Sequence, residues 1–224
     1  MRRCLIVRNL GRMQYNEALV LQKDIAERRK RGDIEDTLLL LEHAPVITLG
    51  RNTGDANVLA TRAALDSLGV ELVESDRGGD ATFHGPGQIV AYPVIDLQPD
   101  RKDIRKYVRS LEAVMTRTLE QFGIRSHGRV DLPGVWLDKP DRKIGAIGAR
   151  VSRWVTHHGF ALNVNTDLSY FDLIVPCGIR EKGVTSMARE LGHVVDMDKV
   201  FKTIAAQFSA VFDRRLVIAS PDDE

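Results

Sequence analysis

Cysteine is scarce in this chain: Cys4 and Cys177 are the two examples in 224 residues. Two thiols so far apart in the sequence, with no Cys-x-x-Cys pair, exclude a disulfide framework and a zinc site built from thiolates. Long apolar runs are also absent, because the longest, such as residues 37–41, cannot cross a bilayer. The basic N-terminus has an apolar run of only four residues, too short for a signal peptide. We therefore expect a soluble, unprocessed, cytoplasmic protein.

A net charge of one sign is lacking as well. The 32 Lys and Arg residues balance 31 Asp and Glu residues, which leaves a net charge of +1. This balance excludes nucleic-acid binding through bulk charge. The length and a hydrophobic content of 43% suit one domain with its own core. We predict a single catalytic domain over residues 1–217 and a frayed tail over residues 218–224.

Hydrophobic periodicity and turn residues predict the elements of that domain. We expect helices over residues 15–31, 61–68, 103–122 and 199–212, and strands over residues 5–7, 37–42, 46–49, 70–74, 89–97, 135–137, 143–151 and 154–164. Pro93 lacks a backbone N–H group, so it indicates an edge strand or a bulge. Strands grouped as hairpins between a few helices favour a layered α/β domain, with a mixed central β-sheet flanked by helices.

The sequence motifs typical of P-loop, dinucleotide-binding, zinc-protease and hydrolase folds are absent. Residues 77–88 hold four glycines, a proline, Arg77, Thr82 and His84 between two predicted strands. Glycines let backbone N–H groups approach a ligand closely. A tight surface turn is the simpler interpretation, but this loop is long for a turn. We therefore interpret it as the wall of a ligand site.

Cys177 stands where an apolar run meets a Pro-Cys-Gly turn. The turn presents the sulfur at the end of an element, and Gly178 lets a carbonyl group approach the backbone N–H groups. Both a catalytic and a structural role fit this position. Cys4 lies inside the first predicted strand, so we assign it to the core.

A nucleophilic cysteine needs a neighbouring cation, because the thiolate is the reactive form. Lys143, His84 and His158 are the candidates for this neighbour, although a lysine at the start of a strand is usually solvated. His157 and His158 are adjacent in a predicted strand, where they point to opposite faces and cannot bind one metal together. Without carboxylates or thiols nearby in the sequence, no metal site is expected.

Two basic runs, residues 28–31 and residues 101–106, lie at predicted helix ends. The first run sits where cations stabilise a helix C-terminus, and solvated helix ends explain both runs most simply. Docking of an acidic protein is the alternative for either run.

The loop and the cysteine together resemble the lipoyl(octanoyl) transferases. The resemblance extends over roughly residues 5–212, and its blocks stand in the family's order. These blocks are Arg77-Gly78-Gly79, Thr82-Phe83-His84, Gln88 with Tyr92, Lys143-Ile144 with Ala146-Ile147-Gly148, His158-Gly159-Phe160-Ala161-Leu162-Asn163, and Pro176-Cys177-Gly178 with Val184-Thr185-Ser186. Gly145 and Met187 depart from the family pattern, in which alanine and leucine are more usual.

The resemblance implies a fold similar to the catalytic domain of biotin and lipoate protein ligases. It implies that Cys177 is the nucleophile and that Lys143 lowers the pKa of the Cys177 thiol. It also implies a substrate-binding set: Arg77, Gly78, Gly79, Asp80, Ala81, Thr82, Phe83, His84, Ala146, Ile147, Gly148, Gly159, Phe160 and Ala161. Small residues in this set would suit a narrow tunnel for an acyl chain.

The implied reaction moves an octanoyl or lipoyl group from acyl carrier protein to a lysine of lipoate-dependent enzymes. The implied acceptors are the lipoyl domains of 2-oxoacid dehydrogenase complexes and the H protein of glycine cleavage. One thioester is exchanged for another at Cys177, so the resemblance implies no cofactor, neither ATP nor a metal. Attack by the lysine amine then completes the first step of protein lipoylation.

Three other functions remain open at this point. An ATP-dependent lipoate or biotin ligase on the same fold would activate a free acid and would not need Cys177. A catalytically inert acyl-binding domain would be expected to lose Cys177 or Lys143, and both are present. A cysteine hydrolase would need a histidine with an Asn or Asp partner, and no such pair is evident in a recognisable context.

Overall fold

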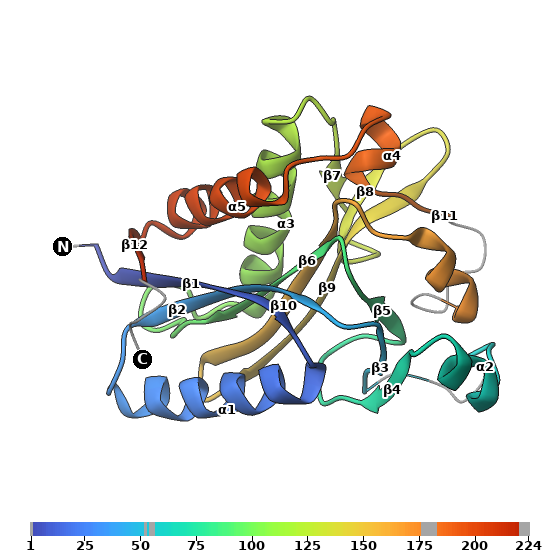
Figure 1. The fold of residues 1–224 in the computed structure, drawn as a ribbon. Coiled ribbons are helices and arrows are strands. Elements are labelled where there is room, and N and C mark those ends of the chain that lie inside the picture. The colour runs from blue at the N-terminus through green and yellow to red at the C-terminus, as the bar shows by residue number, and fades with distance from the viewer. Residues whose placement is uncertain (1, 52, 54–56, 176–182, 220–224) are drawn as a thin grey trace.

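The centre of the protein is a mixed β-sheet of nine strands, shown in Figure 1. The computed structural model describes residues 2–51, 53, 57–175 and 183–219. The strands of the large sheet are β1 (Cys4–Met13), β2 (Asp36–His43), β6 (Gln88–Val94), β7 (His127–Gly128), β8 (Val135–Leu137), β9 (Arg142–Ser152), β10 (Val155–Asn163), β11 (Gly183–Val184) and β12 (Arg215–Ile218). They follow the order β12-β1-β2-β6-β10-β9-β8-β7, and β11 pairs with β9. Because β12, β1 and β2 are parallel and the pairs from β2 to β7 are antiparallel, the predicted mixed sheet is confirmed.

A second, smaller sheet lies beside one end of the large sheet (Figure 1). Its strands are, in spatial order, β4 (Glu71–Glu74), β3 (Val46–Leu49) and β5 (Thr82–His84). The helix α2 (Arg62–Ser67) and the 3-10 helix η2 (Leu168–Leu173) cover it. Leu65 from α2 and Phe171 from η2 complete its separate apolar core.

Helices cover both faces of the large sheet (Figure 1). One face carries α1 (Tyr15–Arg31), and the opposite face carries α3 (Ile104–Glu120) and α5 (Met197–Phe212), which pack against each other. The short helix α4 (Met187–Leu191) precedes α5. None of the helices that the structure describes is long and apolar enough to cross a membrane.

The leucine run of β2 shows how both faces of the sheet are buried. Leu38 and Leu40 belong to the core under α3 and α5, whereas Leu39 and Leu41 belong to the core under α1. Successive side chains of a strand point to opposite faces, so a strand covered on both sides needs an unbroken apolar run. The run therefore marks β2 as a central strand.

Local capping residues set the ends of the main helices. α1 ends at Gly32, whose φ of 82° lies in the left-handed region that glycine adopts without strain. α3 begins after Asp103, whose side chain accepts a hydrogen bond from the Lys106 N–H group. Both boundaries agree with the sequence prediction to within two residues.

The two basic runs are less solvated than predicted. In the first run Arg28 and Arg31 are exposed, but the side chains of Arg29 and Lys30 are only 13% and 9% exposed. In the second run Arg101 is half-buried and donates a hydrogen bond to the backbone at the end of α5. Each run therefore contributes part of its charge to intramolecular contacts.

Pro93 lies in β6, in the middle of the large sheet, so the predicted edge position is wrong. The register that pairs Phe160 with Ala91 places His158 opposite Pro93, which has no N–H group to donate. The ladder between β6 and β10 is interrupted at this point, and Thr156 Oγ1 donates to the Pro93 carbonyl oxygen at 2.7 Å. The sheet accommodates the proline through this interruption.

Other sequence expectations also differ from the structure. Cys4 is half-buried in β1 and does not belong to the core. The predicted loop over residues 77–88 contains β5, and β12 extends to Ile218, one residue into the predicted tail. Residues 220–224 lie outside the described residues. β5 pairs with β3 and β12 pairs with β1, so distant partners hold these short strands and local sequence patterns do not reveal them.

Candidate active site

A pocket lies where the segment after β4 folds over β9 and β10. It encloses about 470 Å³ of empty space, which includes the solvent at its opening. Aliphatic and small side chains form most of the wall, and aromatic side chains with polar atoms form the rest. The lining residues are Tyr15, Arg77, Gly79, Asp80, Thr82, His84, Val90, Tyr92, Ala146, Ile147, Gly148, His158, Gly159, Phe160 and Ala161.

The pocket brings together eleven of the fourteen residues in the predicted substrate-binding set. Gly78 lies in the neighbouring cleft instead. Ala81 and Phe83 point away from the pocket into the core of the small sheet, where Phe83 stacks on Tyr170 with ring centroids 4.6 Å apart. The alternation of β5 explains this correction, because Thr82 and His84 face the pocket and their neighbours face the opposite side.

Two pocket glycines allow close approach between strands. A Cβ atom at Gly159 would lie 2.2 Å from the Ala91 carbonyl oxygen, and one at Gly148 would lie 3.0 Å from Arg77 Cδ. Protein atoms therefore fill the space that a side chain would need at either position. Both glycines line the pocket, and they also let β6 and the 77–80 segment approach β10 and β9.

Arg77 ties the segment after β4 to the small sheet. The residue is 6% exposed. Its guanidinium donates to the Thr48 carbonyl oxygen at 2.6 Å and to Thr48 Oγ1 at 3.0 Å. A further bond to the Gly78 carbonyl oxygen holds the turn itself. Arg77 thus fixes one pocket wall against β3.

His84 presents a neutral ring to the pocket. Its Nδ1 atom lies 2.7 Å from Gln88 Oε1. Gln88 donates through Nε2 to the Phe83 carbonyl oxygen and to Asn163 Oδ1, so its Oε1 accepts and His84 Nδ1 carries the proton. Burial lowers the pKa of His84 to about 3. The ring is therefore neutral near pH 7, with its lone pair on Nε2.

Tyr92 and His43 form a second buried pair beside the pocket. His43 Nδ1 lies 3.0 Å from the Met13 carbonyl oxygen, and His43 Nε2 lies 2.7 Å from the Tyr92 hydroxyl. A carbonyl oxygen only accepts, so Nδ1 donates to it and Nε2 accepts from Tyr92. Burial lowers the pKa of His43 to about 4 and raises the pKa of Tyr92 well above its usual value. Neither group is ionised near pH 7.

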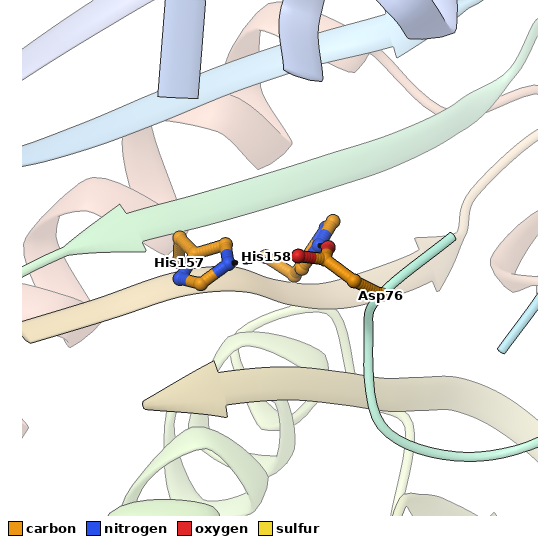
Figure 2. A group of neighbouring side chains, drawn as sticks. All are labelled: Asp76, His157 and His158. Carbon is orange, nitrogen blue, oxygen red and sulfur yellow. Dashed lines mark hydrogen bonds and ion pairs between the residues drawn. The ribbon is translucent and has the colours of Figure 1, made fainter. Parts of the chain in front are cut away.

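Asp76 contacts both histidines of β10, as Figure 2 shows. His158 Nε2 donates to Asp76 Oδ1 at 2.7 Å, His157 Nε2 lies 3.8 Å from Oδ2, and Arg150 forms an ion pair with Oδ2. Burial raises the pKa of Asp76, but the His158 hydrogen bond and the Arg150 charge outweigh it and hold the pKa at about 2. Burial lowers the pKa of His158 to about 4 and also lowers the pKa of His157. At pH 7 the cluster therefore holds a carboxylate and two neutral imidazoles.

The positions of His157 and His158 contradict the prediction that they point to opposite faces. Their ring centroids are only 4.9 Å apart. His158 has a φ of 52°, in the left-handed region, which turns its side chain toward the side of His157. Because Pro93 has no N–H group to donate, the regular pair is broken, and the His158 N–H group donates to Gln22 Oε1 at 2.9 Å. His158 thus departs from the regular alternation at the point where the ladder between β6 and β10 is interrupted.

A wider cleft adjoins the pocket and encloses about 1660 Å³, counted out to its opening. The two share Gly79, Asp80, Ile147 and Gly148 as a common wall. Lys143 lines the cleft but not the pocket. The other cleft residues are Arg51, Asp76, Gly78, Ile104, Tyr107, Val108, Leu132, Pro133, Ala149, Arg150, Val151 and Ser152.

Lys143 is buried, which differs from the solvated side chain usual at the start of a strand. The residue is 9% exposed, and its Nζ lies 4.7 Å from the centre of the Trp136 ring. The Lys143 residue pairs with Val184 in the ladder between β9 and β11, and the Thr185 N–H group donates to the Lys143 carbonyl oxygen at 2.9 Å. Asn163 Nδ2 donates to the Thr185 carbonyl oxygen at 3.0 Å. A hydrogen-bonded chain therefore connects this strand with the Gln88 and His84 pair.

Cys177, the predicted nucleophile, lies outside the described residues. The residues before it are anchored beside the site: the Val175 N–H group donates to the Asn57 carbonyl oxygen at 2.8 Å. Asn57 Nδ2 in turn donates to Asp80 Oδ2 at 2.7 Å, and Asp80 lines both the pocket and the cleft. After it, β11 pairs with the strand of Lys143.

Four pocket residues fall outside the predicted substrate-binding set: Tyr15, Val90, Tyr92 and His158. The two-residue alternation of β6 brings Val90 and Tyr92 to one face, so that signal was present in the sequence. Tyr15 reaches the pocket from α1 and carries no local signal of this role.

Known proteins share both the sequence and the fold of this chain. A family model described as the lipoyl protein ligase A/B catalytic domain matches residues 14–209. The octanoyltransferase of Myxococcus xanthus is 50% identical over 221 residues, which cover 97% of this chain and 62% of that protein, so this chain spans less than two thirds of its length. The octanoyltransferase of Koribacter versatilis is 50% identical over 214 residues, which cover 94% of this chain and 85% of that protein.

Solved structures show the same architecture at low sequence identity. A bi-partite lipoate protein ligase from Thermoplasma acidophilum superposes with a TM-score of 0.75 at 18% identity, covering 99% of this chain and 88% of that one. Biotin protein ligase from Aquifex aeolicus superposes with a TM-score of 0.52 at 13% identity, covering 95% and 70%. These likenesses confirm the predicted ligase-like fold. The sequence matches go further, and by them the chain belongs to the octanoyltransferases, acyltransferases of the lipoyl protein ligase A/B catalytic-domain family.

Proposed function

We propose that the chain transfers an octanoyl or lipoyl group from acyl carrier protein to lysine residues of lipoyl domains, through an acyl thioester on Cys177. The observation that carries this proposal is a largely apolar pocket that shares a wall with a cleft lined by the buried Lys143. The pocket suits the acyl chain, and the wider cleft suits the arm of the carrier and then the acceptor lysine. We place the reacting carbonyl group at the common wall.

The first half-reaction exchanges one thioester for another. The Cys177 sulfur attacks the acyl carbonyl carbon, a new C–S bond forms, and the C–S bond to the carrier's phosphopantetheine breaks. Lys143, as an ammonium ion, stabilises the Cys177 thiolate and donates a proton to the departing thiolate. The two thioesters have similar energies, so this step requires neither ATP nor a metal.

The second half-reaction forms an amide. The acceptor amine attacks the acyl group on Cys177, the C–S bond breaks, and the thiolate is regenerated. Lys143, neutral after the first step, accepts the proton from the amine and returns to its ammonium form. His84 is the other candidate for this proton, but its pKa of about 3 makes it too weak a base near pH 7.

We assign the acyl-chain contacts to the apolar part of the pocket, where Val90, Ile147 and Phe160 are the largest side chains without polar atoms. Arg77 acts on the substrate through the segment that it fixes to Thr48. Ala81 and Phe83 support this segment from the core of the small sheet and are not assigned a substrate contact.

Carrier docking is assigned to the basic run at residues 101–106. Ile104 and Tyr107 line the cleft, and Arg105 and Lys106 between them are exposed. An acidic carrier would meet these charges while its arm enters the cleft. We expect reversal of both charges to raise KM for the carrier with little change in kcat. An unchanged KM would exclude this surface.

We propose lipoyl domains of 2-oxoacid dehydrogenase complexes and the glycine cleavage H protein as acceptors. A single catalytic domain over residues 1–217 and a cytoplasmic location remain part of this proposal. Both follow from the sequence argument alone.

The decisive experiment for the intermediate is intact-protein mass spectrometry after incubation with octanoyl carrier protein alone. We expect one octanoyl adduct that hydroxylamine removes, and no adduct on Cys177→Ala. An equal adduct on that variant, or none on the wild type, would refute the thioester.

The same assay separates a transferase from an ATP-dependent ligase on this fold. A transferase acylates a lipoyl domain from octanoyl carrier protein without ATP. A requirement for ATP with free octanoate as donor, together with full activity of Cys177→Ser, would instead establish a ligase.

The role of Lys143 is tested by the rate of thiol alkylation against pH. We expect Lys143→Ala to shift the profile of Cys177 to higher pH, because the variant loses the cation that stabilises the thiolate. Lys139→Ala, at an exposed position four residues away, is the matched control and should leave the profile unchanged. An unaltered profile in Lys143→Ala would remove Lys143 from this role.

A further inference from the structure

A cluster of metal-ligating side chains lies behind the wall of the acyl pocket. It consists of Asp76, His157 and His158, each with one ligand atom within 4.8 Å of the others (Figure 2). The imidazoles come from adjacent residues of β10, and the carboxylate comes from the segment after β4. His157 is 6% exposed and His158 is 1% exposed. The proposed acyl transfer assigns no role to His157.

The three side chains of the cluster lie close enough together to converge on one metal ion. Zinc binds imidazole nitrogen and carboxylate oxygen at about 2.0–2.2 Å, so neighbouring ligands in a tetrahedron lie about 3.3 Å apart. Here Asp76 Oδ1 lies 2.7 Å from His158 Nε2, and Oδ2 lies 3.8 Å from His157 Nε2. These two separations involve different carboxylate oxygens, and the set with one ligand atom from each residue lies within 4.8 Å. Binding an ion therefore requires side-chain rotations that bring the three ligand atoms closer together.

The chemistry of the donors also fits. Both imidazoles are neutral and Asp76 is ionised at pH 7, which are the forms that bind a metal. His157 Nδ1 and His158 Nδ1 are buried without a hydrogen-bond partner. When a metal takes His158 Nε2, the proton now on that atom moves to Nδ1, so the ring remains neutral. Two imidazoles and one carboxylate are a donor set for borderline divalent ions and leave a position for water.

We propose that Asp76, His157 and His158 bind a divalent transition-metal ion of the zinc class behind the acyl pocket. Because His158 also lines the pocket, the ion would replace the hydrogen bond that now fixes this part of its wall. The site is separate from the proposed Cys177 chemistry and does not depend on it.

Arg150 competes with the metal for Asp76. Its ion pair with Oδ2 must open, and its side chain, 31% exposed, can turn toward solvent. Arg77 and Lys30 add positive charge near the histidines. These cations weaken binding of a divalent ion, so removal of Arg150 should strengthen it.

The test is a calorimetric titration of the full chain, without a polyhistidine tag, with Zn²⁺. Cys177→Ser serves as the background so that its thiol cannot contribute. We expect one ion per chain. His157→Phe should weaken binding at least about tenfold, Asp76→Asn should weaken it similarly, and Arg150→Gln should strengthen it several-fold. Substitution of Co²⁺ for Zn²⁺ gives an absorption band that reports the ligand geometry directly.

His127→Phe is the matched control, because His127 is a half-exposed histidine 3.7 Å from an aspartate and lies outside the cluster. The Zn²⁺ affinity of His127→Phe should equal that of the Cys177→Ser background chain. Thermal unfolding without metal shows whether each variant is folded. Equal affinity in His157→Phe and the background would overturn the proposal, as would a matching loss in His127→Phe. Unchanged affinity in Asp76→Asn would show that Asp76 is not a ligand and would also overturn it.

Discussion

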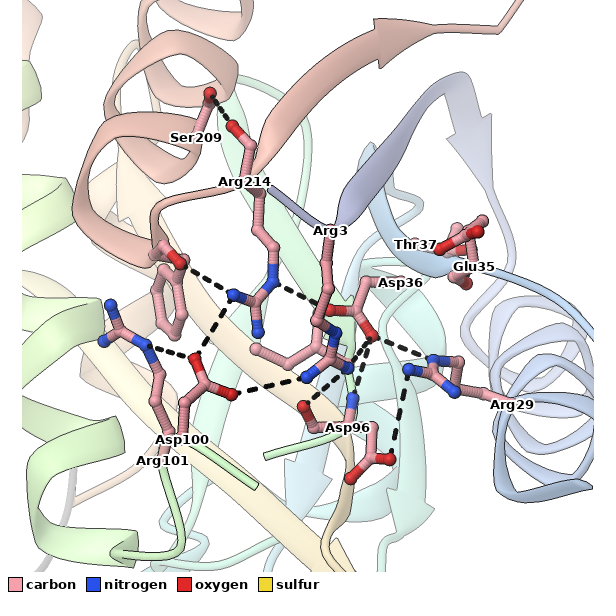
Figure 3. Close-up of polar contacts among 12 residues, drawn as sticks. Arg3, Arg29, Glu35, Asp36, Thr37, Asp96, Asp100, Arg101, Ser209 and Arg214 are labelled. Carbon is pink, nitrogen blue, oxygen red and sulfur yellow. Dashed lines mark hydrogen bonds and ion pairs between the residues drawn. The ribbon is translucent and has the colours of Figure 1, made fainter. Parts of the chain in front are cut away.

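Asp36 and Asp76 are two carboxylates held in opposite ways. Asp36 is fully buried and accepts hydrogen bonds from Arg3 at 3.1 Å, Arg29 at 2.8 Å and Arg214 at 2.9 Å, as Figure 3 shows. The Asp96 N–H group adds a fourth bond at 3.0 Å. Asp76 is 31% exposed at its side chain and has two histidines and a single arginine around it.

The partners decide what each carboxylate can do. Guanidinium groups remain charged at any ordinary pH, and those around Asp36 come from the residue before β1, from α1 and from the residue before β12. The cluster of Asp36 with Arg3, Arg29 and Arg214 joins both ends of the chain to β2, and among the described residues none of its members lines the pocket. The Asp36 cluster therefore has one protonation state, and its role is structural. Imidazoles can change protonation, tautomer or metal ligation, so the Asp76 cluster has several states available.

The largest expected effect is that of Asp36→Asn. Loss of the carboxylate leaves Arg214, 3% exposed at its side chain, without its main counter-charge in a buried site. We expect the free energy of unfolding to fall by about 3–5 kcal/mol, measured by urea denaturation at pH 7. The control is Asp33→Asn, which removes an exposed ion pair with Arg31 and should cost less than about 1 kcal/mol. Similar losses of unfolding free energy in Asp36→Asn and Asp33→Asn would contradict the structural role of the Asp36 cluster.

The second expected effect is a loss of stability in acid, which is caused by the buried histidines. In the unfolded chain a histidine binds a proton below its ordinary pKa near 6.5, whereas folded His84 and His158 do so only near pH 3 and pH 4. The free energy of unfolding therefore falls as pH drops from about 6.5 toward 4, by at most about 1.4 kcal/mol per pH unit for each histidine.

Urea denaturation at several pH values measures this slope, and His84→Gln should reduce it because one neutral buried imidazole is removed. A slope that is the same in wild type and His84→Gln would contradict the assignment. Arginines do not titrate in this range, so Arg28→Ala, at an exposed side chain, should leave the slope unaltered.

The smallest expected effect separates two neighbours in one basic run. Arg29→Ala removes one of three guanidiniums from Asp36, and we expect a loss of about 1–3 kcal/mol. Arg28→Ala removes a 47% exposed side chain near Asp24 and should change stability by less than about 0.5 kcal/mol. Thermal unfolding of the pair measures the difference. Equal midpoints would mean that Arg29 behaves as a solvated residue after all.

Helices whose ends are set by neighbouring residues could be predicted from the sequence. The helix at residues 15–31 carries its own stop at Gly32, and the helix after Asp103 carries its own cap. β5 and β12 could not be found in this way, because each is too short to show a pattern and is held by a strand far away in the sequence. Pro93 was misplaced for a related reason, since its tolerance depends on Thr156 of another strand.

The residues of the candidate site were likewise predictable only where the local sequence determines them. The family resemblance names most of the pocket, because those residues stand in contiguous blocks. It leaves out Tyr15, which enters from a helix, and includes Phe83, which the alternation of β5 turns away. The Asp76 cluster needed the structure, since regular strand geometry would separate two histidines that the left-handed backbone of His158 brings together.

Pro93 has a consequence for how this protein can evolve. It offers no N–H group to β10, and opposite it His158 has a left-handed backbone and donates its own N–H group to Gln22. Any other residue at position 93 would offer an amide to the opposite strand and favour return of His158 to the other face. Substitutions at positions 93 and 158 should therefore show strong epistasis, and the pocket depends on a residue that lies outside its lining.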